Sequence, residues 1–385
     1  MGNSRACLLA VALACLCPAG SVAGREQDAN ERARQAYTRA VELQKAGNHA
    51  GALSLLWEAA GLAPHDADLQ NALGEALERI GALDAAVDAY RQALAERPDD
   101  RKASNNLILA LVKAGKGEEA VQRARADAAA APDDPDGHFT LGLAQSEQNV
   151  SDAIASFRRA LALAPRHTLA RYNLALVLKR ADRLQEAVEE LDRALAIEPR
   201  AEVQYTLGVI YWHQGDVARA AAALRAAVAA RPDYADAHDT LGAVLKSAHD
   251  WKGAAISLRR AIALRPDLST AHYALSQVLQ LTGDARGARA QLAEAERLRL
   301  RADAEREAAV WTAVGIRQFD GGDPAAALES FRRAIGILES YAPAHYQMGR
   351  ALRRLNRLDE ARAAFARARQ LNPSLVPPPD ARPSK

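Results

Sequence analysis

The chain has 385 residues, of which 49% are hydrophobic, only 5% aromatic and 25% charged, and its formal net charge at pH 7 is +2. This balance argues against a nucleic-acid-binding protein, which carries a strong positive excess. All three cysteines, Cys7, Cys15 and Cys17, lie near the N-terminus, so thiol and disulfide chemistry is excluded from the rest of the chain.

Residues 1–23 have the pattern of a secretory signal peptide. Arg5 precedes an apolar stretch over residues 6–17, and Ser21-Val22-Ala23 forms a small-x-small cleavage site. The apolar stretch is too short to span a membrane. We therefore expect cleavage after Ala23 and a periplasmic or secreted protein.

An alternative for the N-terminal segment is a lipid anchor. The residues Ala12-Leu13-Ala14-Cys15 loosely resemble a bacterial lipobox, in which Cys15 would be lipidated. Alanine stands where the lipobox usually has leucine, and cleavage at Cys15 would shorten the apolar stretch. Export with cleavage after Ala23 is therefore the preferred interpretation.

After a lead-in at residues 24–32, a period of 33 or 34 residues runs through the chain. A proline recurs once in each of the first seven units, and we number it as position 32 of its unit. In this numbering, position 20 is alanine in every unit, and positions 8 and 27 are small in most units. A fixed period of this length indicates a solenoid, in which each repeat contacts mainly its neighbours. The proline series is Pro64, Pro98, Pro132, Pro165, Pro199, Pro232 and Pro266.

Each unit reads as two helices joined by a turn. Apolar residues recur three and four positions apart, as Leu174, Val177 and Leu178 do in the fifth unit. A glycine near position 15, such as Gly47 or Gly81, ends the first helix. The proline at position 32 cannot continue the second helix, so the chain turns into the next unit.

This pattern closely resembles the tetratricopeptide repeat, a helix-turn-helix unit of about 34 residues. We count ten units, with repeats 1–8 in residues 33–302 and repeats 9–10 in residues 308–375. The resemblance implies an all-α fold, a right-handed superhelical solenoid of about ten such repeats. No stretch of the sequence is left over for a catalytic domain.

The period is delayed by five residues between the eighth and ninth units. Residues 294–307 are rich in strong helix formers. We predict that the second helix of repeat 8 continues through a helical insertion at 303–307 into the first helix of repeat 9, over about 50 Å. Repeats 9–10 would then be angled from repeats 1–8. The alternative is a short break near Ala302–Asp303 with ordinary stacking.

The two ends of the array differ in charge. Residues 24–100 hold 8 basic and 14 acidic residues, whereas the last repeat, 342–375, holds 7 arginines and 2 acidic residues. This polarity would allow self-association, although two solvated faces are the simpler interpretation. The proline-rich tail at residues 376–385 is expected to be disordered.

In the tetratricopeptide repeat family, the first helices line a concave groove, and positions 2, 5, 6, 9, 12 and 13 tend to face it. Position 5 is aromatic in six units of this chain, and Trp212 stands at position 12 of the sixth unit. Aromatic side chains dominate binding hot spots. The alternative is that these rings pack between neighbouring first helices. The six are Tyr37, Phe139, Tyr172, Tyr205, Tyr273 and Tyr346.

Position 6 is polar in six units, namely at Asn106, Thr140, Asn173, Thr206, Thr240 and Gln347. An evenly spaced row of amides and hydroxyls could hydrogen-bond the backbone of an extended peptide. The row resembles the asparagine ladder in the repeat domain of the O-linked N-acetylglucosamine transferase, with threonine often replacing asparagine. The resemblance implies a peptide-binding groove lined by Tyr37, Asn106, Phe139, Tyr172, Asn173, Tyr205, Trp212, Tyr273 and Tyr346.

The sequence contains no recognisable catalytic, cofactor-binding or metal-binding pattern. No Gly-x-Ser-x-Gly, His-Glu-x-x-His or phosphate-binding loop occurs. Four histidines stand at position 4 of their units, too far apart in sequence to have metal-ligand spacing, and are expected to pack. We therefore expect a protein that is not an enzyme and needs no cofactor.

The function expected from the sequence is that of a non-enzymatic scaffold or adaptor that binds an extended protein segment in the concave groove. One alternative is a substrate-targeting subunit for an enzyme on another chain, such as a glycosyltransferase. Another is a lipid-anchored envelope assembly factor. The fold alone does not choose among them, because function depends on sites rather than folds.

Overall fold

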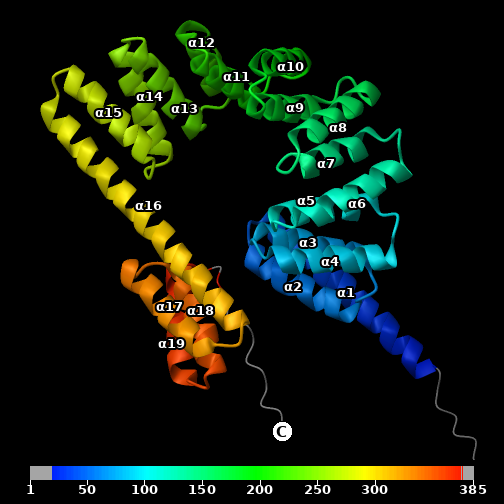
Figure 1. Ribbon diagram of the computed structural model, residues 1–385. Coiled ribbons are helices and arrows are strands. Elements are labelled where there is room, and N and C mark those ends of the chain that lie inside the picture. The colour runs from blue at the N-terminus through cyan, green and yellow to red at the C-terminus, as the bar shows by residue number, and fades with distance from the viewer. Residues whose placement is uncertain (1–19, 374, 376–385) are drawn as a thin grey trace, which may run out of the picture. The chain divides into compact units, whose positions relative to one another are not determined.

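The computed structural model describes residues 20–373 and 375, which form 19 α-helices and no strand (Figure 1). The predicted all-α repeat fold is therefore confirmed. The predicted signal peptide lies outside the described residues, except for residues 20–23 at the start of the first helix. Cys15 and the proline-rich tail also lie outside them.

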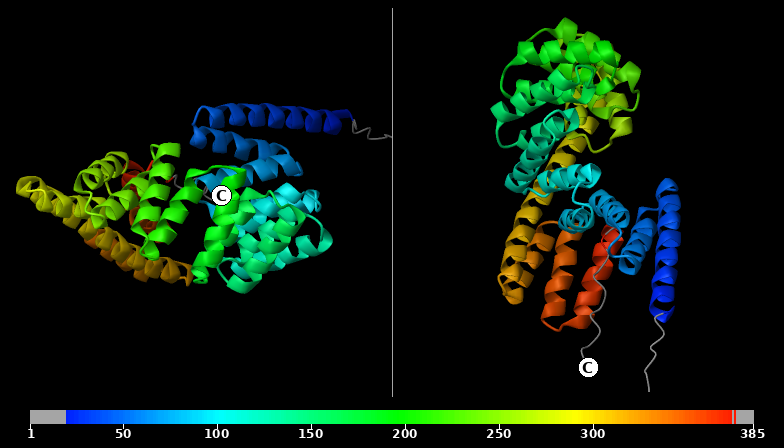
Figure 2. Two further views of the ribbon diagram at one scale, coloured as in Figure 1. Left: turned by 90° about the horizontal axis from the view of Figure 1, so that it is seen from above. Right: turned by 90° about the vertical axis from the view of Figure 1, so that its right-hand side faces the viewer.

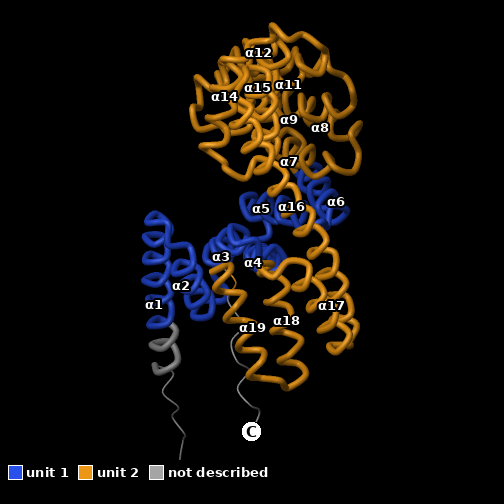
Figure 3. The backbone as a smooth tube through the Cα atoms, turned by 90° about the vertical axis from the view of Figure 1, so that its left-hand side faces the viewer, with its two compact units in different colours: residues 1–130 blue, residues 131–385 orange. Residues whose placement is uncertain are grey.

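The chain divides into two compact units, residues 1–130 (the N-terminal unit) and residues 131–385 (the C-terminal unit), which Figure 3 shows in blue and orange. The N-terminal unit contains α1 (Gly20–Lys45), α2 (His49–Leu62), α3 (Ala67–Arg79), α4 (Leu83–Glu96), α5 (Arg101–Lys113) and α6 (Gly117–Ala130).

The C-terminal unit contains the remaining thirteen described helices, again in helix-turn-helix pairs up to α15. They are α7 (Pro135–Gln145), α8 (Val150–Leu163), α9 (Thr168–Arg180), α10 (Leu184–Ile197), α11 (Ala201–His213), α12 (Val217–Ala230), α13 (Ala235–Ser247), α14 (Trp251–Leu264), α15 (Ser269–Leu281), α16 (Ala285–Asp320), α17 (Pro324–Ile337), α18 (Ala342–Arg354) and α19 (Leu358–Leu371).

The turn inside each repeat needs a left-handed residue at position 15. Six repeats place glycine there, with φ between +74° and +88°. Three repeats place Asp182, His249 or Asn356 there instead, with φ of +59° to +61°. Because the left-handed region is strained for residues with a Cβ atom, these three turns are less favourable than the glycine turns.

Asp182→Gly is therefore expected to stabilise the protein by about 0.5–1 kcal/mol, because it removes left-handed strain at an exposed position. The measurement is the midpoint of thermal or urea unfolding. Asp182→Ala is the control and should not stabilise the protein, since alanine keeps the strained Cβ atom. Equal midpoints for the two variants would show that the turn is not strained.

Small residues at position 8 allow the two helices of a repeat to touch. A Cβ atom added to Gly208 would lie 2.6 Å from Cγ of Leu224, and one added to Gly74 would lie 2.5 Å from Cε1 of Tyr90. Leu224 and Tyr90 both stand at position 24 and are fully buried. In the repeats that have glycine at position 8, the glycine thus makes room for the large side chain at position 24.

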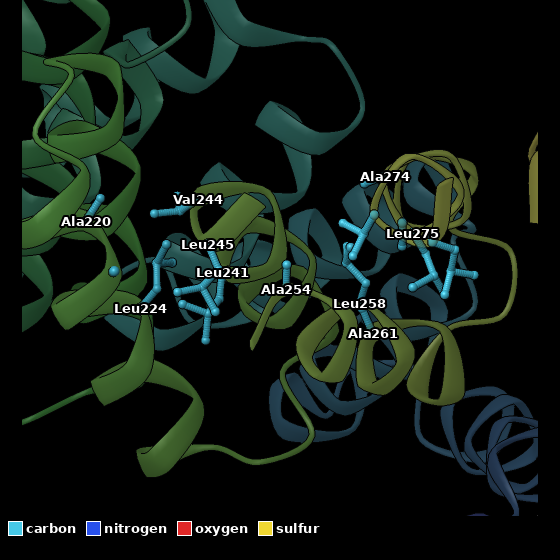
Figure 4. Packing of buried hydrophobic residues seen from close by; sticks show 14 of the residues in the cluster. Ala220, Leu224, Leu241, Val244, Leu245, Ala254, Leu258, Ala261, Ala274 and Leu275 are labelled. Atoms are coloured by element: carbon cyan, nitrogen blue, oxygen red, sulfur yellow. The ribbon is translucent and has the colours of Figure 1, made fainter. Parts of the chain in front are cut away.

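Neighbouring repeats are joined by apolar packing and by hydrogen bonds at position 4. In Figure 4, Leu224 of α12 faces Leu241 and Leu245 of α13 in one buried cluster. At position 4, a ring nitrogen of His138 lies 2.9 Å from the carbonyl oxygen of Pro132, and a ring nitrogen of His272 lies 3.0 Å from that of Pro266. These histidines bind the preceding loop, in agreement with the packing role expected from the sequence.

The continuous helix expected between repeats 8 and 9 is present. Helix α16 runs for 36 residues from Ala285 to Asp320 and is unbroken in both views of Figure 2. At 1.5 Å per residue it is about 54 Å long. Ion pairs one turn apart support its middle, such as Arg301 with Glu305 at 3.0 Å and Arg299 with Asp303 at 3.4 Å. The alternative break near Ala302–Asp303 is absent.

Candidate functional site

A polar cluster of four side chains lies on the first helices α3 and α5 of the N-terminal unit. Oε1 of Glu75 accepts hydrogen bonds from Nδ2 of Asn71 (3.0 Å) and Nδ2 of Asn106 (3.3 Å), and lies 2.8 Å from Nζ of Lys102. Nδ2 of Asn106 also donates to Oδ1 of Asn71 at 3.0 Å. We call these four residues the Glu75 cluster.

In the Glu75 cluster, the side chains of Asn71 and Glu75 hold two polar side chains that solvent can reach. Asn71 is buried, Glu75 and Asn106 are half-buried, and Lys102 is exposed. The hydrogen bond with Glu75 raises the pKa of Lys102, so its ammonium group stays charged. Oδ1 of Asn106 has no hydrogen-bond donor among the described residues and remains able to accept one from a ligand.

The predicted aromatic residues mostly pack against neighbouring helices. Tyr37 of α1 is half-buried against a cluster that includes Ala59 of α2 and Leu69 of α3. In the C-terminal unit, the ring of Phe139 lies 5.9 Å from that of Phe157 and 4.8 Å from that of His167, between centroids. Both side chains contact neighbouring residues and are half-buried.

The same holds for three further members of the aromatic set. The Tyr172 hydroxyl lies 3.4 Å from Oγ1 of Thr206, and the Tyr205 ring lies 5.0 Å from that of Tyr234. Burial, the largest cause, raises the pKa of Tyr234 to about 12. Trp212 packs against the buried cluster around Leu224.

At the end of the chain, the Tyr346 ring makes an edge contact with Phe365 at 5.5 Å. Tyr273 of α15 differs from the other aromatic residues of the set, because 52% of its surface is exposed. Tyr273 also lines a cleft of about 630 Å³ formed by residues of α13 to α16. The lining residues are Lys246, Trp251, Tyr273, Ser276, Gln277, Gln280, Leu281, Ala288, Arg289 and Leu292.

The polar row at position 6 does not form one continuous ladder. Thr140 and Thr206 are buried, and the Thr206 hydroxyl donates to the carbonyl oxygen of Glu202 at 2.9 Å. Nδ2 of Asn173 donates to the carbonyl oxygen of Leu169 in its own helix at 2.9 Å. The amide pair that links two consecutive first helices is instead Asn106 with Asn71.

Sequence reasoning missed Asn71 and Glu75 as partners of Asn106. Both stand at groove-facing positions, 5 and 9 of the second repeat. The groove prediction from the sequence was based on aromatic residues and on the polar residues at position 6. A search for charged and amide side chains at positions 2, 5 and 9 would have found Asn71, Glu75 and Lys102 together.

The described residues hold neither a candidate metal site nor a membrane-spanning helix. Across residues 20–373 and 375, no group of three or more histidine, cysteine, aspartate or glutamate side chains is arranged to hold a metal ion. Over the same part of the chain, every helix is too short or too polar to cross a membrane.

Comparison with protein families gives a consistent result along the chain. Family models described as tetratricopeptide repeat match residues 37–101 and 83–136, residues 144–210, and residues 201–234 and 342–375. Together the matched ranges cover more than half of the chain. No curated protein matches the sequence significantly.

Several solved structures are similar to this chain. A tetratricopeptide repeat protein from Parabacteroides merdae is 18% identical, with a TM-score of 0.51 over 65% of this chain and 99% of that chain. MamA from Desulfovibrio magneticus is 25% identical, with a TM-score of 0.38 over 43% of this chain and 95% of that chain. YrrB, described as a TPR protein with an unusual peptide-binding site, is 18% identical, with a TM-score of 0.41 over 46% of this chain and 91% of that chain.

Proposed function

The chain belongs to the tetratricopeptide repeat family, and from this premise we propose that it is an exported, non-enzymatic scaffold that binds an extended segment of a client protein. The observation that carries the proposal is the Glu75 cluster, in which side chains of two consecutive first helices are fixed around one carboxylate. The export rests on the signal-peptide pattern of residues 1–23.

The Glu75 cluster offers the groups that recognise a peptide backbone. Oδ1 of Asn106 accepts from a backbone N–H, and the exposed Lys102 ammonium donates to a backbone carbonyl or a client carboxylate. Because Asn71 and Glu75 already hold these two side chains, little conformational entropy is lost on binding. Main-chain hydrogen bonds of this kind give affinity with modest sequence choice.

The test is a quantitative pull-down with the full chain as bait, carrying a C-terminal tag. Cell-envelope extract is the source of clients because residues 1–23 predict export. The Lys102→Ala/Asn106→Ala double variant should recover about tenfold less client than wild type, since each lost hydrogen bond costs roughly 0.5–1.5 kcal/mol. Isotope-labelled mass spectrometry gives the ratio for each captured protein.

The matched control is Gln122→Ala, which removes an exposed amide from the second helix α6, outside the Glu75 cluster. Its captures should equal those of wild type. If the double variant and Gln122→Ala retain the same clients, the Glu75 cluster is not the binding surface.

A further inference from the structure

At ordinary junctions, the first helix of one repeat covers the core of the repeat before it. Helix α15, for example, packs against both α13 and α14. Position 24 of one repeat then shares a buried cluster with positions 7 and 10 of the next. Leu224 with Leu241 and Val244 is one case, visible in Figure 4.

Helix α16 interrupts this arrangement after repeat 8. Residues 308–320, which correspond to the first helix of repeat 9, continue along the axis of α16 instead of folding back (Figure 1). Leu292 at position 24 of repeat 8 and Val310 at position 3 of repeat 9 are therefore about 27 Å apart along one helix. The eighth repeat thus lacks the helix that covers an ordinary repeat.

Two residues that are buried at the equivalent positions of other repeats are exposed because no helix folds back over repeat 8. Leu292 is 42% exposed, whereas the other nine residues at position 24 are at most 8% exposed. Val310 is 61% exposed, whereas Ala170, Val203 and Ala237 at the same position 3 are at most 1% exposed. The nine buried residues at position 24 are Leu56, Tyr90, Ala124, Phe157, Leu191, Leu224, Leu258, Phe331 and Phe365.

The tenth repeat shows that a missing helix alone does not open a cleft. No described helix follows α19, yet Phe365 is buried in a cluster with Leu328 and Leu352, and the Tyr346 ring packs against that cluster. In repeat 8 the equivalent Tyr273 is largely exposed, as is Leu281. The cleft between α15 and the first half of α16 is therefore open and mainly apolar.

Repeat 9 is unsuited to fill this cleft. Position 21 is Arg289 in repeat 8 and position 10 is Arg317 in repeat 9, and both are exposed. At the junction of repeats 6 and 7 the same positions are Ala221 and Val244, which are buried in one cluster. Docking repeat 9 there would bury two guanidinium groups together, which is costly. The same cost applies to repeat 9 of a second copy.

The charges around the cleft indicate the chemistry of its occupant. None of the ten lining residues is acidic. Nζ of Lys246 donates to Oε1 of Gln277 at 2.5 Å, and Arg289 has no carboxylate partner within the described part of the chain. A carboxylate on the occupant would form a charge-assisted hydrogen bond with Arg289.

We infer that this cleft binds an amphipathic α-helix of a partner protein, in the place of the missing first helix. Its apolar face lies on Tyr273, Leu281 and Leu292, and a carboxylate of the helix pairs with Arg289. Helix-in-groove recognition of this kind uses anchors three and four residues apart. The site is independent of the Glu75 cluster.

The probe is a peptide with the sequence of residues 235–247, the first helix of repeat 7, which covers the equivalent face of repeat 6. It is acetylated, amidated and stapled on its outer face, because isolated helices of this length are marginal in water. One version carries Val244→Glu, which brings a carboxylate to the position facing Arg289, and its twin carries Val244→Lys. Fluorescence anisotropy with the full chain gives both affinities.

The Glu peptide is expected to bind about tenfold more tightly than the Lys peptide. Arg289→Glu should reverse this order, and Leu292→Ser should weaken both peptides. Arg286→Glu is the matched control, since Arg286 is exposed on the same helix outside the cleft. Asn106→Ala should change neither affinity, which separates this site from the Glu75 cluster.

Equal affinities of the two peptides, or a preference that survives Arg289→Glu, would overturn the inference. Sedimentation of the full chain gives a second check. If the chain forms a dimer that Leu292→Ser dissociates, the occupant is a second copy and not a partner helix. Melting curves confirm that each variant is folded, as expected for substitutions at exposed positions.

Discussion

Gly208→Leu is expected to destabilise the C-terminal unit by about 3 kcal/mol, among the largest effects of any single substitution in the chain. A Cβ atom at this position would lie 2.6 Å from Cγ of Leu224 and 3.3 Å from the backbone oxygen of Ala220. Leu224 is fully buried and cannot move away, and the backbone of α12 cannot move without separating the two helices. The measurement is the midpoint of urea unfolding, followed by circular dichroism.

Two further variants test whether the loss of stability comes from the contact between positions 8 and 24. Gly336→Leu, in α17 of the same unit, places the same side chain where nothing lies within 4 Å, and should stabilise by up to about 1 kcal/mol. Adding Leu224→Ala to Gly208→Leu should restore part of the lost stability, because the new side chain then enters the vacated space. An unchanged midpoint for Gly208→Leu would mean that positions 8 and 24 do not meet as described.

Much of the fold could be predicted because its determinants are local. The prolines, the turn glycines and the small residues at positions 8 and 20 each act within one repeat or on the next one. The long helix could also be predicted, since the five-residue delay coincides with strong helix formers and no turn residue. These features depend on backbone conformation, which short stretches of sequence largely specify.

The candidate sites were harder to predict because they depend on contacts between repeats. Leu224 and Leu292 are the same residue type at the same position, yet one is buried and the other is 42% exposed. The difference arises from contacts with other parts of the chain: α13 folds back over Leu224, whereas neither a following helix nor Tyr273 covers Leu292. Likewise, position 5 faces both the groove and the neighbouring helix, so the sequence left open whether Tyr172 or Tyr205 would pack or remain free.

Ala302→Pro is expected to cost about 3 kcal/mol locally, because Ala302 lies in the interior of α16. Proline removes the hydrogen bond to the carbonyl oxygen of Leu298, and its ring clashes with that carbonyl. Since each repeat contacts mainly its neighbours, the damage should stay near the substitution instead of unfolding the whole chain. Hydrogen exchange of the amides in residues 298–306 should therefore accelerate by about a hundredfold.

The control Ala302→Gly keeps the backbone N–H and should cost only about 1 kcal/mol, with a correspondingly smaller rise in exchange. The comparison separates a continuous helix from a turn. In a chain with a break at Ala302–Asp303, proline would be tolerated, as it is at position 32 of the ordinary repeats, and the two variants would behave alike. A large difference between them would instead establish that α16 is continuous through Ala302, so that residues 308–320 extend along its axis away from Leu292.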